Sequence, residues 1–459
     1  MAAIMTKPMR ELGVILLFVF CLVDVSQALP SFAQQTGQPC SACHVGAFGP
    51  QLKPYGRDFK LYGYTSSDGQ KHLPPISLTL QSSFTHTVGP QEGLVAQAFK
   101  ANNNFVGDQE LSAYFGGRIT KDVGAFIQVT YDGAAGNLQW DSVDVRYAHP
   151  MQIFGQDSVL GVTVSNGPTV QDLWNSIPSW GFPYNSSSLA PSPAAAALAD
   201  GGLTGQVLGA GVYASWNGLL YGEVTVYRNL SPRILDGLGV SSTQGGTADR
   251  FGGAIPYARL AIEHGTDNHY FQAGAFSLLA ERYPGGDQST GTTDRISDRA
   301  LDATYQFLGS KTQFVSAHAI YIHENQDLRA DQILGGTLAN DSLSTLRADV
   351  SYSLRDTWTP SIQFFETTGS RDVARWGTPN GSPDSRGYVA ELAYVPLGKI
   401  KSLPQWMNVR VAAQYVAYDV FDGSSRGSSL NNTVYLSLWI AVAPFYAVEK
   451  NFAPKPGMR

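Results

Sequence analysis

Apolar residues recur at every second position through most of this chain, from about residue 77 to Phe445. The alternation is clearest in four segments, residues 142–147, 347–355, 408–415 and 434–442. Such a period places apolar side chains on one face of a strand and small or polar ones on the other. Asn217-Gly218, a strong hairpin signal, stands between two such runs, 208–216 and 219–228. Segments of roughly ten alternating residues joined by turns indicate an all-β fold and are typical of a transmembrane antiparallel β-barrel.

Two architectures fit this alternation: a barrel in a membrane, and a large soluble sandwich or propeller. The barrel is favoured because the polar faces carry charges of both signs beside Ser, Gly and Gln, as a wet lumen would. The apolar runs also end in Tyr, Trp or Phe, as the aromatic girdles of membrane barrels do. About 370 residues, at roughly 23 for each strand and its loop, predict about 16 strands over residues 76–445.

The first 28 residues have the pattern of an export signal. Lys7 and Arg10 precede an apolar run from Leu12 to Val23, and Ser26-Gln27-Ala28 forms a small-residue cleavage site. We therefore expect residues 1–28 to be removed from the exported protein, which would begin near Leu29. No later run reaches the roughly 18 apolar residues of a membrane helix. The net charge of -6 argues against nucleic acid as a partner.

A C-x-x-C-H box, Cys40-Ser41-Ala42-Cys43-His44, follows the export signal. This box is the attachment signature of a c-type haem: each thiol can form a thioether, and the adjacent imidazole can ligate the iron. A zinc half-site and a disulfide loop are the alternatives. Zinc would need two further ligands, and a disulfide would leave the His without a role. The sequence therefore predicts one covalent haem c on Cys40 and Cys43, with His44 as an axial iron ligand.

Residues 29–75 between the signal and the barrel are too few to bury an adequate core alone. A haem needs most of its surface shielded from water, and the nearest concave wall is the barrel lumen. We therefore expect this segment to act as a haem-bearing plug inside the barrel. Five aromatic residues could pack on the porphyrin: Phe48, Tyr55, Phe59, Tyr62 and Tyr64. Arg57 and Lys60 could neutralise haem propionates or could be ordinary surface charges.

One long segment near residues 165–205 interrupts the strand pattern. It contains several prolines, which cannot join a sheet interior, and a low-complexity stretch over 186–199. Trp174, Trp180, Phe182 and Tyr184 are too apolar for a solvated loop. We predict that 166–184 fold inward and narrow the lumen, and that 186–202 form an exposed flexible connection. A polar tail, residues 446–459, follows Phe445.

The chain resembles outer-membrane porin–cytochrome fusions, single polypeptides with one c-type haem ahead of a barrel. Their best-known members are monohaem outer-membrane iron oxidases. The resemblance is most specific in the haem segment and extends through most of the exported chain. It rests on residues 36–44, 46–52, 55–57 with 63–64, 83–87, 168–172, 180–183, 414–415 and 431–433. One departure is the polar tail, because outer-membrane barrels commonly finish on an aromatic residue.

The resemblance implies a protein of the bacterial outer membrane that passes electrons from an extracellular reductant, such as Fe(II), to a periplasmic carrier. It could then be an iron(II):cytochrome-type oxidoreductase or an electron-transfer protein without its own catalytic constellation. The alternative is a diffusion porin whose haem is structural or sensory, and a peroxidase-like role is a weaker third. For the distal haem ligand we consider His86, which follows the haem segment, and then His72, beside the Pro74-Pro75 turn.

Overall fold

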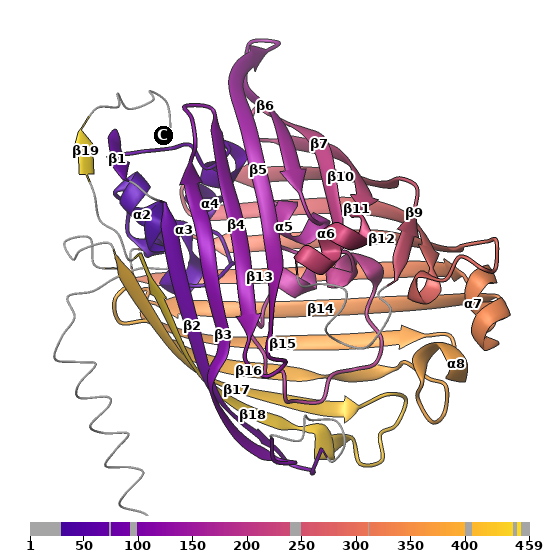
Figure 1. Ribbon diagram of the computed structural model, residues 1–459. Helices are drawn as coiled ribbons and strands as arrows, with labels where there is room; N and C mark the ends of the chain where they lie inside the picture. The colour runs from indigo at the N-terminus through magenta and orange to yellow at the C-terminus, as the bar shows by residue number, and fades with distance from the viewer. Residues whose placement is uncertain are drawn as a thin grey trace, which may run out of the picture.

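A computed structural model describes residues 29–72, 75–91, 99–238, 249–310, 312–399, 406–443 and 448–450. The predicted signal peptide, residues 1–28, and most of the polar tail lie outside the described residues. The alternating strands form one continuous antiparallel sheet that closes on itself (Figure 1). Closure comes from the pairing of the last long strand, β18 (Thr433–Val442), with the first, β2 (Ile76–Thr87).

Sixteen strands cross the wall of the barrel, as predicted. The sheet has 17 strands, but one of them, β9 (Arg250–Gly252), only extends it locally while β8 and β10 pair directly. The other wall strands, in chain order, are β3 (Asn103–Arg118), β4 (Val123–Asp132), β5 (Asn137–Ile153), β6 (Gln156–Ser165), β7 (Val207–Trp216), β8 (Leu220–Asn229), β10 (Ile255–Gly265), β11 (His269–Tyr283), β12 (Asp294–Phe307), β13 (Gln313–Asp327), β14 (Asn340–Leu354), β15 (Trp358–Gly369), β16 (Ser385–Tyr394) and β17 (Met407–Val420).

The two ends of the barrel differ in the length of their connections. At one end, which we call the short-turn end, strands are joined by brief turns such as 119–122, 154–155 and 217–219. At the other, the long-loop end, connections such as 166–206 and 328–339 are longer and carry short helices. Helices α7 (Arg329–Gly335) and α8 (Val373–Trp376) lie there, opposite the N-terminal helices (Figure 1). The remaining elements of the loops are α5 (Pro168–Gln171), η2 (Pro178–Trp180), η3 (Leu198–Gly202), α6 (Pro232–Gly237), η4 (Pro284–Gly286) and η5 (Ser428–Asn431).

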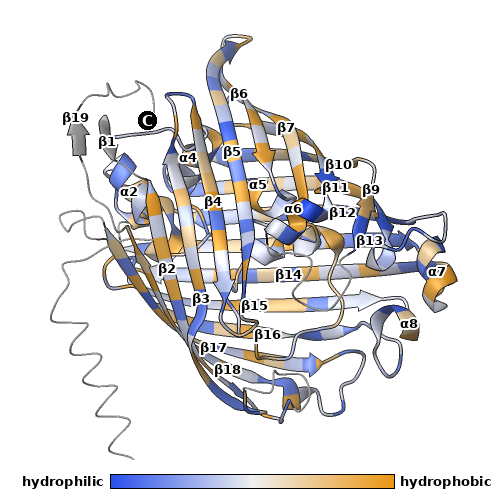
Figure 2. Ribbon diagram, viewed as in Figure 1, coloured by the Kyte–Doolittle hydropathy of each residue, from blue (hydrophilic) through white to orange (hydrophobic). Residues whose placement is uncertain are grey.

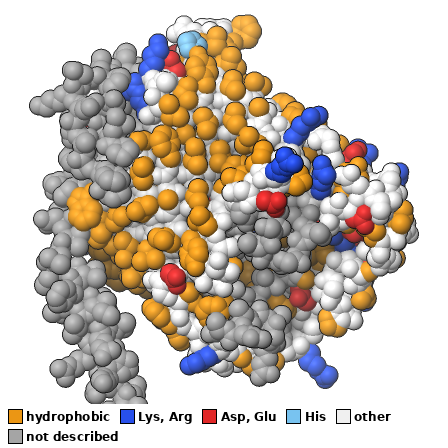
Figure 3. Space-filling model, in the orientation of Figure 1, with side chains coloured by type: hydrophobic (Ala, Val, Ile, Leu, Met, Phe, Trp, Pro, Cys, Tyr) orange, Lys and Arg blue, Asp and Glu red, His pale blue; other side chains and the backbone are white. Residues whose placement is uncertain are grey.

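The outer surface of the barrel is apolar. Hydrophobic and hydrophilic residues alternate along the strands (Figure 2), and the apolar positions point away from the lumen. Leu260 and Leu301 are 71% and 64% exposed there, and orange side chains cover the middle of the visible face in Figure 3. An apolar belt on the outside of a closed barrel fits contact with the lipid bilayer. A soluble sandwich would instead bury these apolar side chains in its core. In the described part of the chain no helix is long and apolar enough to cross a membrane.

The N-terminal segment lies inside the barrel, at the short-turn end. It consists of α2 (Pro30–Thr36), α3 (Cys40–Cys43), η1 (Val45–Ala47) and α4 (Pro54–Leu61), and we call residues 29–69 the plug. Backbone and side-chain bonds fasten the plug to the barrel at this end: Ser41 N donates to Gly398 O at 3.1 Å, and Lys53 pairs with Asp356 at 2.9 Å. After the plug, β1 (Gln70–His72) pairs with β19 (Val448–Lys450).

Candidate functional site

The C-x-x-C-H box forms one turn of helix followed by a tight return loop. Residues three apart in a helix lie on the same face, so α3 presents the thiols of Cys40 and Cys43 to the same side. The chain then turns back at Gly46, whose φ of 66° suits glycine, and His44 forms an isolated β-bridge with Leu52. Lys53 N donates to Cys43 O at 2.8 Å, which closes the loop beneath the box.

The barrel wall holds the box from the other side. Asn408, on β17, donates from Nδ2 to Ala47 O at 2.9 Å and approaches the Cys40 sulfur at 3.6 Å. Cys40 is 3% exposed and packs with Phe48, Val395 and Trp439. Cys43 is only half-buried and faces a cavity. Cys40 therefore lies against the barrel wall, whereas Cys43 lies beside the cavity.

Gly56 brings helix α4 against the box. A Cβ atom at this position would lie 2.5 Å from the Cys43 carbonyl oxygen and 3.1 Å from its Cα, and backbone atoms cannot move aside as a flexible side chain can. We expect Gly56→Ala to strain the box by about 1–3 kcal/mol and to lower covalent haem per molecule of purified barrel severalfold, measured by haem-stained gels.

Gly237→Ala is the matched control for this prediction. Gly237 ends helix α6, and a Cβ atom there would meet nothing within 4 Å. Because alanine favours helix over glycine, this variant should keep the wild-type haem content. Equal haem staining in Gly56→Ala and Gly237→Ala would show that the close approach of α4 does not shape the box.

The ring of His44 is prepared to act as a ligand. Its Nδ1 is buried and has no hydrogen-bond partner among the described residues, and His44 lines the cavity. Burial lowers the pKa of the His44 imidazole to about 4, so the ring is neutral at pH 7. A neutral imidazole is the form that binds a metal.

The cavity beside His44 lies between the plug, the barrel wall and the long loop 166–206. The free space between its walls is about 1340 Å³, including the part open to solvent. Five aromatic side chains supply much of its apolar lining: Phe48, Phe59, Phe126, Trp180 and Trp439. Polar groups also reach it, among them Lys60 from the plug and Glu110 and Asp141 from the wall.

These residues fit a haem. The space is flanked by aromatic side chains, Cys43 and His44 both line it, and Nδ1 of His44 has no hydrogen-bond partner among the described residues. Lys60 brings to the same cavity an amine that can donate a hydrogen bond to a propionate and that carries a positive charge when protonated. Arg57, the other propionate candidate, is committed elsewhere: its guanidinium donates to Leu52 O at 2.8 Å and stacks on Tyr270 at 3.8 Å.

Not every aromatic residue of the plug reaches the cavity. Phe48, Phe59 and Tyr64 line it, but Tyr62 packs against a different part of the wall and Tyr55 faces another hollow. The segment therefore contributes three of the five aromatic side chains that the sequence suggested.

The first candidate for a distal ligand, His86, does not lie in the cavity. His86 belongs to the outward face of β2, with Leu78, Leu80 and Phe84, and its Nδ1 lies 2.8 Å from Asn103 Oδ1. Because the sheet separates it from the lumen, this placement removes His86 as a distal ligand. His72 ends β1, and its side chain lies outside what the structure describes.

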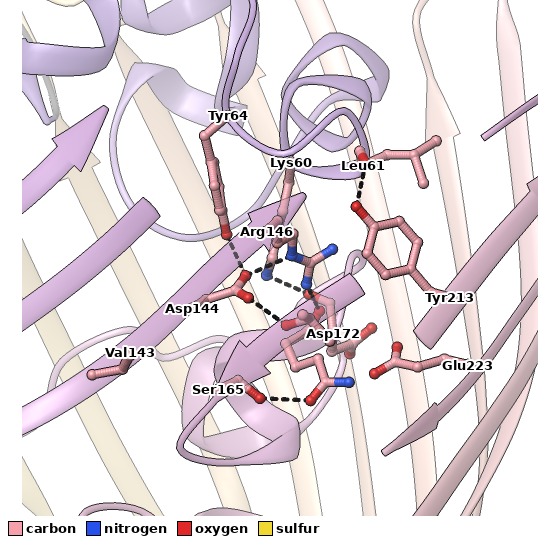
Figure 4. Close-up of polar contacts among 12 residues, drawn as sticks. Lys60, Leu61, Tyr64, Val143, Asp144, Arg146, Ser165, Asp172, Tyr213 and Glu223 are labelled. Carbon is pink, nitrogen blue, oxygen red and sulfur yellow. Dashed lines mark hydrogen bonds and ion pairs between the residues drawn. The ribbon is translucent and has the colours of Figure 1, made fainter. Parts of the chain in front are cut away.

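A buried charge cluster joins the plug, the loop and the wall (Figure 4). Asp144 and Arg146 of β5 form an ion pair at 2.7 Å with no exposure of either side chain, and Tyr64 of the plug donates to Asp144 at 2.6 Å. Asp172 of the loop lies 3.5 Å from Arg259 of β10. We call Asp144, Arg146, Asp172, Arg259 and Asp302 the lumen charge cluster, in which Arg259 also pairs with Asp302 at 2.8 Å.

The long loop folds into the lumen and contacts the barrel wall in both of its halves. Its first half folds inward as expected: Trp174 donates to Tyr270 Oη at 2.7 Å, and Trp180 and Tyr184 line the cavity. The prediction that 186–202 are an exposed connection is only partly right, because Ser188 and Ser192 are exposed but Leu189 between them is buried. Small side chains such as Ala197 and Ala199 pack on the wall, while Leu198 N and Ala199 N donate to Glu324 and Asp298 at 2.6 and 2.7 Å.

Comparisons with known proteins support no particular family. No family model matches the chain, and no curated protein matches it. Solved structures similar to it include the outer membrane channel DcaP of Acinetobacter baumannii, with 11% identity and a TM-score of 0.44 over 83% of this chain and 99% of that chain. The anion-selective porin from Comamonas acidovorans has 10% identity and a TM-score of 0.43 over 81% and 99% of the two chains. A Vibrio cholerae OmpT variant that lacks loop L8 has 6% identity and a TM-score of 0.42 over 82% and 99%.

These likenesses are too distant to carry an argument, so the class of protein rests on the strand pairing and burial described above. The fold and the site define a transmembrane β-barrel whose lumen is filled by an N-terminal plug and an inward loop. The plug carries a C-x-x-C-H box that faces an aromatic cavity.

Proposed function

We propose that this protein is an outer-membrane cytochrome c–porin that carries electrons from an extracellular reductant to a periplasmic carrier. Fe(II) is the donor to test first. The observation that carries the proposal is the position of the C-x-x-C-H box inside the barrel, where Cys43 and His44 line an aromatic cavity. A redox group placed there would stand in the one path that a barrel offers through an insulating membrane.

The orientation follows from the connections between strands. Membrane barrels of this kind have short periplasmic turns and longer extracellular loops. The short-turn end, where the plug enters, would then face the periplasm, and the loop 166–206 would separate the cavity from the cell exterior. The cavity would thus lie between an outer donor and an inner carrier.

Each residue of the site has a definite part in this proposal. Cys40 and Cys43 would attach the haem as thioethers, and neutral His44 would bind its iron. Phe59, Trp180 and the other aromatic walls would keep water from the porphyrin faces. When bound, a haem supplies one-electron exchange at its iron. The protein would then act either as an iron(II):cytochrome-type oxidoreductase or as an electron-transfer protein without further catalytic groups.

The second candidate is a diffusion porin with a structural or sensory haem. Its basis is the barrel itself, because barrels with 16 strands can enclose an aqueous channel. The interior argues against free diffusion through the centre, since Arg146 and Arg259 face the lumen and yet are only 0% and 1% exposed. A lumen that conducts solutes would wet these guanidinium groups.

The decisive assay uses liposomes with an electron acceptor trapped inside and a membrane-impermeant reductant outside. We expect the wild-type protein to reduce the acceptor at least tenfold faster than the His44→Ala variant. His44→Ala removes the axial ligand, while the barrel should stay folded because its backbone bonds run between strands. Heat-modifiable migration on gels checks that both proteins insert.

The same liposomes separate the two candidates. If the variant reduces the trapped acceptor as fast as the wild type, the electron-conduit proposal fails. Release of a small trapped dye by both proteins would then support the porin. Adding Fe(II) as the external reductant tests that donor directly.

A further inference from the structure

Lys60 lines the cavity. It also lies beside Asp144, Arg146 and Asp172 of the lumen charge cluster (Figure 4). Its side chain is only 4% exposed, and its Nζ donates to Asp172 O at 2.6 Å and to Asn175 Oδ1 at 3.1 Å. An ammonium group has three N–H donors, so these two bonds leave one for a group in the cavity. The ring of Trp180, 5.6 Å from Nζ, forms part of the same wall.

The surroundings of Lys60 bring its charged and neutral forms close to equal population near pH 7. Burial, together with the nearby positive charge of Arg146, lowers the pKa of Lys60 to about 7, although Asp144, Asp172 and Glu223 oppose the shift. Both the ammonium and the neutral amine are therefore accessible near pH 7. The charged groups facing Lys60 come from every element around it: Asp144 and Arg146 on β5, Asp172 on the loop, Glu223 on β8, and Glu110 and Asp141 across the cavity.

We propose that Lys60 couples electron arrival in the cavity to the uptake of one proton. This inference rests on the haem of the proposed function. An external donor would give one electron to the bound haem, and the neutral amine of Lys60 would take up one proton from solvent in the cavity to become an ammonium. Oxidation by the periplasmic carrier reverses both changes.

The direction of the effect follows from electrostatics. Reduction makes the cavity more negative, and a nearby negative charge favours the ammonium form. In acid, Lys60 is charged in both redox states, so the midpoint potential is high and independent of pH. In alkali, Lys60 is neutral in both states and the potential is low. Between these limits the potential should fall by up to about 59 mV for each pH unit, the value for one electron and a tenfold change.

The test is a spectroelectrochemical titration of the purified, haem-loaded protein in detergent, over about four pH units centred on neutrality. Lys60→Arg keeps a charge that does not titrate in this range, so its potential should stay near the acidic plateau at every pH. Lys60→Met removes the charge, so its potential should stay near the alkaline plateau. Lys121→Met, on an exposed turn where the lysine side chain is 80% exposed, should keep the wild-type slope.

Two results overturn the coupling. A wild-type potential that does not change with pH excludes it without any variant, and a full slope in Lys60→Met assigns the proton to another group. The first of these results overturns the coupling even if both Lys60 variants fail to take up haem. Purified protein with no covalent haem would instead overturn the proposed function, and the coupling with it, so haem staining tells the two failures apart.

Discussion

Deleting the plug should turn a closed barrel into an open channel. In the intact protein, residues 29–69 occupy the lumen at the short-turn end, and their contacts with β5 and the loop leave Asp144 and Arg146 without exposure. A barrel of 16 strands has room for an aqueous path once its contents are removed. We expect single-channel conductance in planar bilayers to rise at least tenfold in the variant that lacks residues 29–69.

The strand ladder should survive this deletion, because each strand finds its hydrogen-bond partners in its neighbours. Part of the loop should stay inside the lumen, because the ion pair of Asp172 with Arg259 and the bond of Trp174 to Tyr270 do not involve the plug. The opening should therefore be smaller than that of an empty barrel. Equal conductance of the intact protein and the variant would show that the plug does not seal the lumen.

A haem-free protein with an intact plug provides the control. Cys40→Ala combined with Cys43→Ala removes both thiols but leaves the bonds of Tyr64 to Asp144 in the wall and of Lys60 to Asp172 in the loop. If the plug rather than the haem closes the barrel, this double variant should stay as closed as the wild type. If it conducts like the deletion variant, the haem itself must order the plug.

The wall of the barrel was predictable because strand patterning is local. Each strand shows its two faces within about ten residues, and the alternation of 434–442 places Leu436 and Leu438 outside, as the structure does. The turn at Asn217-Gly218 joins β7 and β8 as predicted. The strand number followed from chain length, since each strand and loop uses a similar number of residues.

The contents of the lumen were harder to predict because their partners are distant in sequence. Asp172 meets Arg259 and Lys60 only after the loop has folded inward. One signal was present: Asp144 and Arg146, two residues apart in β5, must share a face. Two opposite charges on a lumen face indicate a buried pair, which is retained only when both partners are held in place.

The low-complexity stretch of the loop, 186–199, shows a second reason why a sequence-based prediction can fail. Its Ala, Ser and Pro residues resemble a flexible connection, and nothing in their side chains indicates a partner. In the structure the backbone supplies the contacts, as Leu198 N and Ala199 N donate to wall carboxylates. His86 illustrates the opposite case, because its position in the alternation of β2, with Leu80 and Phe84, already indicated an outward face.

Replacing both cysteines of the box should abolish covalent haem. Thioether bonds survive denaturation, whereas coordination by His44 alone does not. The wild-type protein should therefore keep its haem stain on a denaturing gel, Cys40→Ala or Cys43→Ala should reduce it sharply, and the double variant should fall to background. Ser41→Ala is the matched control. Ser41 bonds to Gly398 and Lys53 through its backbone atoms, so the substitution keeps these bonds and both thiols.

The three interpretations of the C-x-x-C-H box respond differently to treatment of the purified protein. A zinc ion would leave with a strong chelator, a disulfide would open with a thiol reductant, and a thioether-bound haem would withstand both. Acid–acetone extraction gives the sharpest result, since it removes haem that is held only by coordination. If extraction strips all haem from the wild type, the covalent assignment to Cys40 and Cys43 is wrong. Resistance of the wild type and Ser41→Ala to extraction, with no haem in the double variant, would place one haem c at the plug and make the cavity beside His44 its pocket.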